Sequence, residues 1–385
     1  MIIAIDANEA NIKKRVGSNQ FAFEVIWEMY KEMVDGRWPM VNKFLIFLSK
    51  KPRADFPPET DWWKYEVFGP RRFWTWTGLT RRLYWGKLKP DVLFSPSHYG
   101  PLFSPIPHVI SIMDLGFLRW PEQFTKKDFY QLKYWTKWSV KRAKKIIAIS
   151  EFTKRDIIKT YRIDPDRVIV AYPGYKKTPN PKFQIPNSYQ APNSKFQKLL
   201  GKVKKKYEIK GKYILYLGTL KPSKNIEGLL EAFKLLIPPL KLVIAGKKGW
   251  LYQQIFEKVR QLGLKNRVLF PGFIPDEEVP ILIEGAEVFV MPSFWEGFGI
   301  PVLEAMDAGV PVVCSDRGAL PEIVGDAALL TNPDKPTKIA KAIEKVLFDV
   351  SVRDKLVKSG KERVKSFSWE KCSKIILDSV VKLAS

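Results

Sequence analysis

The chain has 385 residues, of which 45% are hydrophobic and 27% are charged, a composition that predicts about two folded domains and excludes a disordered chain. Its two cysteines, Cys314 and Cys372, exclude a disulfide framework and a cysteine-rich metal site, and no apolar run has the length of a membrane span. The formal net charge of +25 indicates an anionic partner, such as phospholipid, nucleic acid or a phosphorylated substrate.

The first half of the sequence alternates short apolar runs with helical patterns. The runs at 1–7, 43–49, 91–95, 108–113, 145–150 and 167–172 are typical of buried parallel strands. Helical periodicity predicts helices over 20–33 and 125–144. The opening MIIAIDA has no basic leader, so we interpret it as a first strand and not as a signal peptide. This order of elements predicts a doubly wound parallel sheet.

Positive charge is concentrated in residues 51–212, which carry a net +21, whereas residues 1–50 carry +1 and residues 213–385 carry +3. Tryptophans there are interleaved with basic residues: Trp62, Trp63, Trp74, Trp76 and Trp85 with Arg71, Arg72, Arg81 and Arg82, then Trp135 and Trp138 with Lys141 and Arg142. Such a mixture suits an anionic membrane or single-stranded nucleic acid. The alternative is that the tryptophans are core residues and the charges are solvated.

The composition changes at residues 176–196, KKTPNPKFQIPNSYQAPNSKF, which are rich in Pro, Asn, Ser and Lys. Regular structure is not expected in such a stretch. We therefore predict a linker or insertion over 176–210, between a basic first domain at 1–175 and a second domain at 211–365. An amphipathic pattern over 366–385 predicts a last helix that crosses back to the first domain.

The second domain has its own strand series, at 212–218, 241–246, 267–272, 288–293 and 310–315, and several of these runs end in glycine before a helix. This pattern predicts a second Rossmann-like domain, in which ligands bind at the carboxyl ends of the strands. Pro301 and Gly309 predict a helix from about Ile300 to residue 308. The loop before this helix contains Gly297, Phe298 and Gly299.

Two glutamates flank this predicted helix start. Backbone N–H groups of Gly299 and Ile300 suit a phosphate. Glu304, one turn into the helix, is placed to accept hydrogen bonds from a ribose diol, and Glu296, ahead of the helix, from a sugar hydroxyl. The alternative is an ordinary helix with surface glutamates.

A second candidate phosphate loop lies in YLGTLKPSKNIEGLLEAF, between a strand and a helix. Lys221 and Lys224 lie in this loop, where a cation could stabilise a diphosphate leaving group. The alternative is a pair of solvated loop lysines.

The stretch MPSFWEGFGIPVLEAMDAGVPVVCSDRGALPEIVGDAALLTNP closely resembles the C-terminal signature of the retaining glycosyltransferases of family four. LGTLKPSKNIEGLLEAF is similar to their basic phosphate loop, and PGFIPDEEVPILIEGAEVFV to the segment that passes the nucleotide base. The resemblance implies the GT-B fold, with two Rossmann-like domains facing across a cleft. It also implies a nucleotide-diphosphate sugar as donor, with Glu296 on the sugar, Glu304 on the ribose and Lys224 beside the diphosphate.

The first half resembles the family more loosely. IIAIDANEANIKKRVGSNQFAFEVIWEM matches a first strand, glycine loop and helix, in which Gly17 would approach the donor phosphate or the acceptor. His98, in SPSHYGP, is a candidate acceptor-binding residue, and His108 is expected to be structural. We interpret Asp164-Pro165-Asp166 as a turn and expect no metal and no cofactor.

Two positions depart from the family pattern. Ser223 stands where the family usually has an arginine beside the loop lysine, and Lys221 is a candidate to compensate. Met113 stands where the family usually has a histidine before the aspartate that is here Asp114, a catalytic candidate. Methionine cannot share a proton, so either this branch of the family works without the histidine or the enzyme is impaired. We favour the first alternative, because the leaving phosphate can take the acceptor's proton.

Together these patterns predict a cytoplasmic retaining hexosyltransferase that moves a sugar, with GDP-mannose slightly favoured as donor, to a glycan or lipid-linked acceptor in cell-envelope polysaccharide synthesis. Peripheral contact with an anionic membrane is expected, and a nucleic-acid partner is not. The alternative, based on Met113 and Ser223, is a nucleotide-sugar-binding protein without efficient transfer activity.

Overall fold

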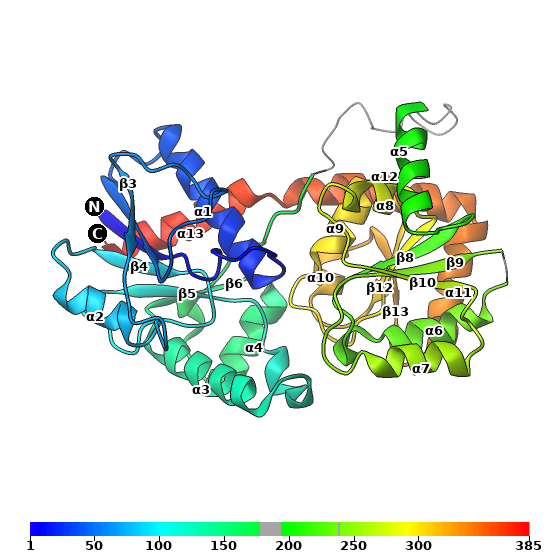
Figure 1. The fold of residues 1–385 in the computed structure, drawn as a ribbon, viewed down its shortest axis with the longest axis horizontal. Helices are drawn as coiled ribbons and strands as arrows, with labels where there is room; N and C mark the ends of the chain where they lie inside the picture. Colours follow the sequence, from blue (N-terminus) through cyan, green and yellow to red (C-terminus); the bar gives the residue numbers. More distant parts are fainter. Residues whose placement is uncertain (178–193, 238, 385) are drawn as a thin grey trace. The chain divides into compact units, whose positions relative to one another are not determined.

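The computed structural model describes residues 1–177, 194–237 and 239–384 and divides the chain into two compact units (Figure 1). Unit 1 comprises Met1–Gly174 and Phe367–Ser385, and unit 2 comprises Tyr175–Ser366. Residues 178–193 of the predicted linker lie outside the described residues.

Unit 1 is built on a seven-stranded sheet in the order β3-β2-β1-β4-β5-β6-β7, in which every pairing is parallel. The strands are β1 (Ile2–Asp6), β2 (Lys43–Leu48), β3 (Trp63–Val67), β4 (Val92–Ser95), β5 (His108–Ile112), β6 (Lys145–Ala148) and β7 (Val168–Val170). All the predicted strands of this half are confirmed, and β3 is an additional strand that was not among the predicted runs.

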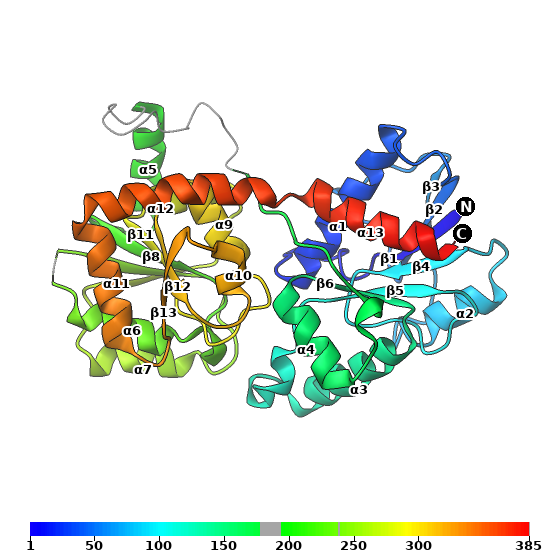
Figure 2. The same ribbon diagram turned by 180° about the vertical axis from the view of Figure 1, so that it is seen from behind.

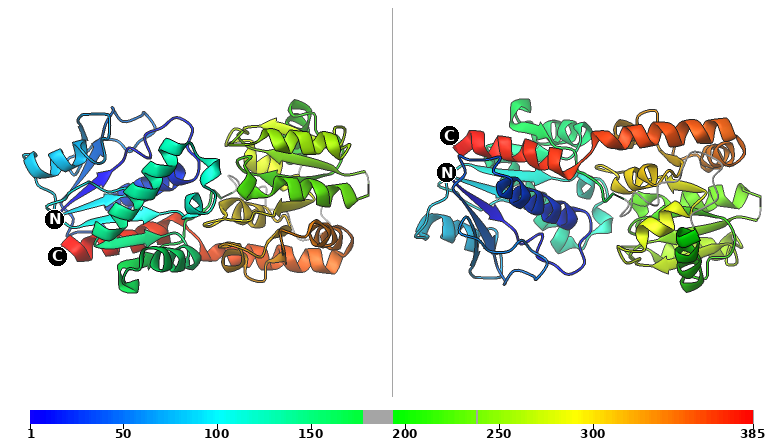
Figure 3. Two further views of the ribbon diagram at one scale, coloured as in Figure 1. Left: turned by 90° about the horizontal axis from the view of Figure 1, so that it is seen from below. Right: turned by 90° about the horizontal axis from the view of Figure 1, so that it is seen from above.

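Helices cover both faces of this sheet (Figures 1, 2 and 3). They are α1 (Ser18–Val34), α2 (Gly78–Trp85), α3 (Lys126–Arg142), α4 (Glu151–Tyr161) and α13 (Trp369–Ala384), with short 3-10 helices η1 (Gly116–Leu118), η2 (Pro121–Gln123) and η3 (Pro165–Arg167). Helices α1 and α13 pack together on one face, whereas α2, α3 and α4 bury apolar side chains on the other. The predicted helices at 20–33 and 125–144 are confirmed as α1 and α3, and the predicted turn at Asp164 is confirmed as the start of η3.

The tryptophans of the basic segment divide between core and surface. Trp63 and Trp74 are buried in the core of unit 1, so for them the core alternative is correct. Trp63, in β3, contacts the ring of Tyr30 edge to face and the ring of Phe44 at a tilt. Trp85, at the end of α2, is exposed.

Unit 2 is built on a six-stranded parallel sheet in the order β10-β9-β8-β11-β12-β13. The strands are β8 (Tyr213–Leu217), β9 (Lys241–Ala245), β10 (Val268–Gly272), β11 (Val288–Met291), β12 (Val312–Ser315) and β13 (Ala328–Thr331). The first five confirm the predicted second strand series.

The helices of unit 2 also form two layers (Figures 1 and 2). They are α5 (Ser194–Lys206), α6 (Ile226–Leu235), α7 (Gln253–Gln261), α8 (Val279–Glu284), α9 (Ile300–Asp307), α10 (Leu320–Val324), α11 (Pro336–Phe348) and α12 (Val350–Arg363), with the 3-10 helices η5 (Pro222–Lys224) and η6 (Val364–Ser366). Helix α6 packs against α7 and α11, and α9 packs against α8 and α12. Helix α5 packs on α8, so residues 194–206 of the predicted linker are a helix of unit 2.

None of the described helices combines the length and the apolar character that a membrane crossing requires.

Candidate active site

The strand order places one topological switch point in each sheet. In unit 2 the chain builds β8, β9 and β10 outward in one direction and then returns to place β11 on the other side of β8. In unit 1 the same reversal occurs between β1 and β4. Loops that follow the two strands at such a point diverge and leave room for a ligand at the carboxyl end of the sheet.

The loop after β8 is fixed by Asn225, a residue that no sequence motif marks as functional. Asn225 is in the left-handed conformation with φ 54° and caps α6 by accepting a hydrogen bond from the N–H of Gly228. Its side-chain amide donates to the carbonyls of Pro292, at 3.1 Å, and Pro333, at 2.7 Å. This one buried side chain therefore ties the candidate phosphate loop to the chain after β11 and after β13.

Lys224 and Glu296 meet at the switch point. The Nζ of Lys224 lies 2.5 Å from Oε1 of Glu296, and the hydroxyl of Ser293 donates to the same oxygen at 2.9 Å. The two charged side chains are only 15% and 12% exposed. A cation and a carboxylate with so little water around them attract each other more strongly than a surface pair does.

Helix α9 begins where the sequence predicts. Gly299 precedes it with φ 100°, a conformation open to glycine, and Pro301 occupies its first turn. Phe298 is buried, so this residue and Gly297 can offer a ligand only their backbone. The first N–H groups of α9 have no partner within the helix, which makes this end suited to an anion.

Glu304 lies one turn into α9 and is partly buried. Burial raises the pKa of Glu304 to about 7, and Lys176 opposes this by its charge and by a hydrogen bond from its backbone N–H. The neighbouring Tyr175 donates from its hydroxyl to Asp307 at 3.1 Å. Tyr175 and Lys176, the first two residues of unit 2, thus contact both acidic residues of α9.

The loop after β12 supports Glu296 from behind. The N–H of Ala319 donates to the Glu296 carbonyl at 3.0 Å. Gly318 has φ 67°, and a Cβ there would lie 2.7 Å from that carbonyl oxygen and 2.9 Å from the Glu296 nitrogen. Only glycine allows the backbone of residue 318 to lie this close to Glu296. No sequence motif indicates this requirement for Gly318.

The unit 1 candidates lie at the carboxyl end of its sheet, in the loops after β1, β4 and β5. Gly17 precedes α1 with φ 55°. Asp114 accepts from the N–H of Gly116 at 2.7 Å and so shapes its own loop. His98 accepts from the N–H of Met113 at 3.1 Å through Nε2, which leaves the proton on Nδ1. His98 therefore lies against the backbone of Met113, the position at which the family histidine is absent.

The histidines have shifted pKa values. Burial lowers the pKa of His98, and Asp114 opposes this shift. Burial also lowers the pKa of His108 to about 4, which agrees with the structural role predicted for this residue. Within the described part of the chain, no three His, Cys, Asp or Glu side chains are grouped so as to hold a metal ion.

Comparison with known proteins agrees with this architecture. The model of glycosyl transferases group 1 matches residues 201–363, and that of glycosyltransferase family 4 matches residues 49–177. The O-antigen chain mannosyltransferase B of Escherichia coli is 34% identical over 286 residues, 72% of this chain and 71% of that protein. The O-antigen chain mannosyltransferase RfbU of Salmonella typhimurium is 30% identical over 237 residues, 62% of this chain and 60% of that protein.

Among solved structures, HepE of Anabaena in complex with UDP-glucose superposes with a TM-score of 0.72 at 19% identity, over 99% of both chains. At this identity the likeness concerns the fold. The family models and the Escherichia coli relative carry the assignment: the chain belongs to the group 1 glycosyltransferases of family four and has their GT-B fold.

Proposed function

We propose that this glycosyltransferase moves a hexose from a nucleotide-diphosphate sugar to a glycan or lipid-linked acceptor and retains the configuration at the anomeric carbon. The observation that carries the proposal is the ion pair of Lys224 and Glu296 at the switch point of unit 2. In the same unit, α9 presents its N-terminus after Gly299 and holds Glu304 one turn further on.

Each group has a part in the proposed reaction. The bond between the anomeric carbon and the diphosphate breaks, and a bond from the acceptor oxygen to the same face of that carbon forms. Lys224 and the N-terminus of α9 stabilise the negative charge that grows on the diphosphate. The leaving diphosphate takes the acceptor's proton, so the step requires no base at Met113. Glu296 accepts hydrogen bonds from donor-sugar hydroxyls, and Glu304 accepts them from the ribose.

GDP-mannose is the donor we favour, since two relatives in the comparison are O-antigen mannosyltransferases. HepE, which shares the fold, was solved in complex with UDP-glucose. Both the base and the sugar of the donor should therefore be varied in the assay. We propose cell-envelope polysaccharide as the product class and the cytoplasm as the location. Both cysteines are free and buried, as is usual in a reducing compartment.

A second candidate function is nucleotide-sugar binding without efficient transfer. Met113 and Ser223 favour it, because neither side chain supplies the charge or the proton that the family usually has at these positions. His98, held against the backbone of Met113, offers one remaining imidazole at that edge of the sheet.

Transfer assays separate the two candidates. The full chain is incubated with GDP-mannose, GDP-glucose, UDP-glucose and UDP-galactose, each with a mannoside acceptor bearing an apolar tail, and the product is examined by proton NMR. The proposal predicts turnover with one donor and an α-linked product from an α-linked donor. A β-linked product contradicts retention, and donor binding without turnover on any acceptor favours the binding protein.

A further inference from the structure

Unit 1 carries an aromatic and basic surface over α2 and α3, on the sheet face opposite to α1 and α13 (Figure 3, left). We name it the α2–α3 surface. Its exposed aromatic side chains are Phe73, Tyr84, Trp85, Phe103, Tyr130 and Tyr134. Its exposed cations include Arg71, Arg72, Arg81, Lys133, Lys137 and Lys141.

The two stretches of chain that form this surface are free of acidic residues. Residues 67–90 hold six Lys and Arg, and residues 129–150 hold another six, with no Asp or Glu in either stretch. Of these, Arg82 is neutralised by Glu66 at 2.5 Å. A surface with so little compensating acid attracts anions over its whole area.

Phe103 joins α2 to α3. Its carbonyl accepts from the hydroxyl of Thr80 in α2 at 3.1 Å. The guanidinium of Arg142, at the end of α3, lies over the rings of both Phe103 and Trp138, at 5.0 Å and 4.3 Å from their centroids. These contacts make one continuous surface of the two helices.

The outward side of α3 combines aromatic and basic side chains at helical spacing. Tyr130 and Tyr134 are one turn apart and stack with their rings 6.0 Å apart and 8° from parallel. Lys133 and Lys137 are one turn apart in the same way, and the ammonium of Lys133 lies 5.8 Å from the Tyr134 ring. Side chains with this spacing share one side of a helix, and tyrosine beside lysine is the composition of a helix that lies at a membrane interface.

Trp85 extends this apolar character to α2. It is 75% exposed and lies next to Tyr84 and close in sequence to Leu88, both also exposed. Tryptophan is costly to leave in water and is enriched at membrane interfaces, where its ring faces the acyl chains and its N–H faces water.

The ring geometry favours a bilayer over single-stranded nucleic acid. Nucleic-acid bases need free aromatic faces on which to stack. Here Trp76 stacks on Trp135 at 4.1 Å, and Tyr130 stacks on Tyr134. These rings already cover one another on one face, whereas Trp85, Tyr84 and Leu88 are exposed apolar side chains.

We propose that the α2–α3 surface binds the anionic face of a phospholipid bilayer, with the lysines and arginines at the headgroups and Trp85 inserted among them. The surface belongs to unit 1, whereas Lys224, Glu296 and Glu304 belong to unit 2. Membrane binding and donor binding can therefore be measured separately, and either can fail without the other. Binding would bring a lipid-linked acceptor to the enzyme.

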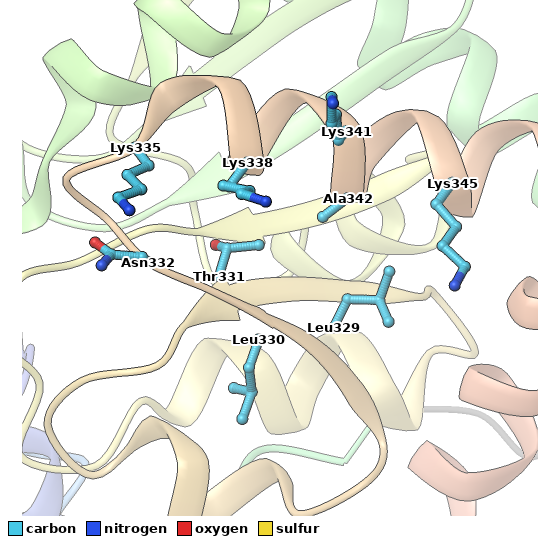
Figure 4. A pocket seen from close by; sticks show the side chains of 9 residues that line it. All are labelled: Leu329, Leu330, Thr331, Asn332, Lys335, Lys338, Lys341, Ala342 and Lys345. Atoms are coloured by element: carbon cyan, nitrogen blue, oxygen red, sulfur yellow. The ribbon is translucent and has the colours of Figure 1, made fainter.

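Helix α11 of unit 2 provides a matched control surface. A pocket of about 430 Å³ between α11 and β13 is lined by Lys335, Lys338, Lys341 and Lys345 (Figure 4). Helix α11 packs against β13, the edge strand of its sheet. Three lysines of α11, Lys338, Lys341 and Lys345, are exposed like Lys133, Lys137 and Lys141 of α3, but no tyrosine lies between them.

The test is flotation of the full chain with phosphatidylcholine vesicles and with vesicles that also contain phosphatidylglycerol, at low and high salt. One variant combines Lys133→Glu, Lys137→Glu and Lys141→Glu, and its control combines Lys338→Glu, Lys341→Glu and Lys345→Glu. A further variant is Trp85→Ser. We expect salt-sensitive binding to the anionic vesicles only. The α3 variant should lose about 100-fold in partition, Trp85→Ser should lose part of the binding, and the α11 variant should keep it.

Three results overturn the proposal: no flotation of the unaltered chain, equal losses in the α3 and α11 variants, or tighter binding of the chain to a single-stranded oligonucleotide than to the anionic vesicles at the same concentration of negative charge. Circular dichroism and thermal unfolding of the same samples show whether each variant is folded.

Discussion

The ammonium of Lys224 lies 2.5 Å from the carboxylate of Glu296, although the two residues are 72 positions apart in the sequence. They meet because β8 and β11 are neighbours in the sheet and each carries one of them in the loop that follows. One contact therefore holds the positive charge that we propose for the leaving diphosphate and the carboxylate that we propose for the donor sugar.

Lys224→Ala should lower kcat by about 100- to 1000-fold, because it removes a charge aimed at the leaving group. The donor Kd should rise less. Steady-state transfer kinetics together with donor titration measure the two effects.

A double-mutant cycle with Glu296→Gln serves as the control. Since the two side chains act as a pair, the combined variant should lose much less than the product of the single losses. Fully multiplicative losses would show that the residues act independently.

Gly318→Ala should lower transfer activity by on the order of 100-fold, because its Cβ displaces the backbone of Glu296 and misplaces the carboxylate. Gly263→Ala is the matched control: its φ is 68°, close to the 67° of Gly318, and no atom lies within 4 Å of the added Cβ. It should lose about 1 kcal/mol of stability from backbone strain and keep its activity. Equal losses of activity in both variants would refute the role of Gly318.

The sequence predicts the start of α9 and the candidate roles of Glu296 and Lys224. Proline and glycine determine the backbone conformation where they stand, and a charged side chain in a loop after a strand is a candidate ligand-binding group. It does not predict what supports them. Gly318 is a glycine whose requirement is set by a neighbouring loop, and Asn225 depends on two distant carbonyls. Such constraints follow from strand order, which a single sequence does not specify.

The fold was predictable for similar reasons. Buried parallel strands are apolar throughout, so nearly all were found from their runs alone. Strand β3 is not predicted because its sequence, WKYEV, alternates apolar and polar residues at the edge of the sheet and has no continuous apolar run. Helix α5 was missed because it begins inside a stretch rich in Pro and Asn.

Donor affinity should rise with pH and level off above about 7. The pKa of Glu304 is raised to about 7 by burial, so below this pH the carboxyl is protonated and must lose its proton to accept the ribose hydroxyls. The affinity for GDP-mannose should fall by up to about tenfold per pH unit below 7. The diphosphate of a nucleotide sugar does not titrate in this range, whereas the terminal phosphate of GDP does.

Glu304→Gln tests the origin of this pH dependence. At pH 8 the variant should bind GDP-mannose more weakly than the unaltered chain does. Because the amide does not titrate, the affinity of the variant should change little between pH 5.5 and 8. A variant that keeps the full slope would assign the titration to another group.

Tyr175→Phe should loosen α9, because the phenol that donates to Asp307 is lost, at a cost of about 1 kcal/mol. Amide hydrogen exchange over Ile300–Asp307 should become faster, and donor affinity should fall. The matched control is Tyr161→Phe in unit 1, whose buried hydroxyl has no hydrogen-bond partner in the described part of the chain. That variant should leave exchange in α9 unchanged, and faster exchange in both variants would remove the special role of Tyr175.

Calorimetric titration of GDP-mannose into the full chain and into Lys224→Ala tests the central claim most directly. The account predicts saturable one-to-one binding to the unaltered chain, weakened in the variant and weakened further by salt. Binding of equal strength in both proteins would contradict it, as would the absence of binding for GDP-mannose and for every other nucleotide sugar tried.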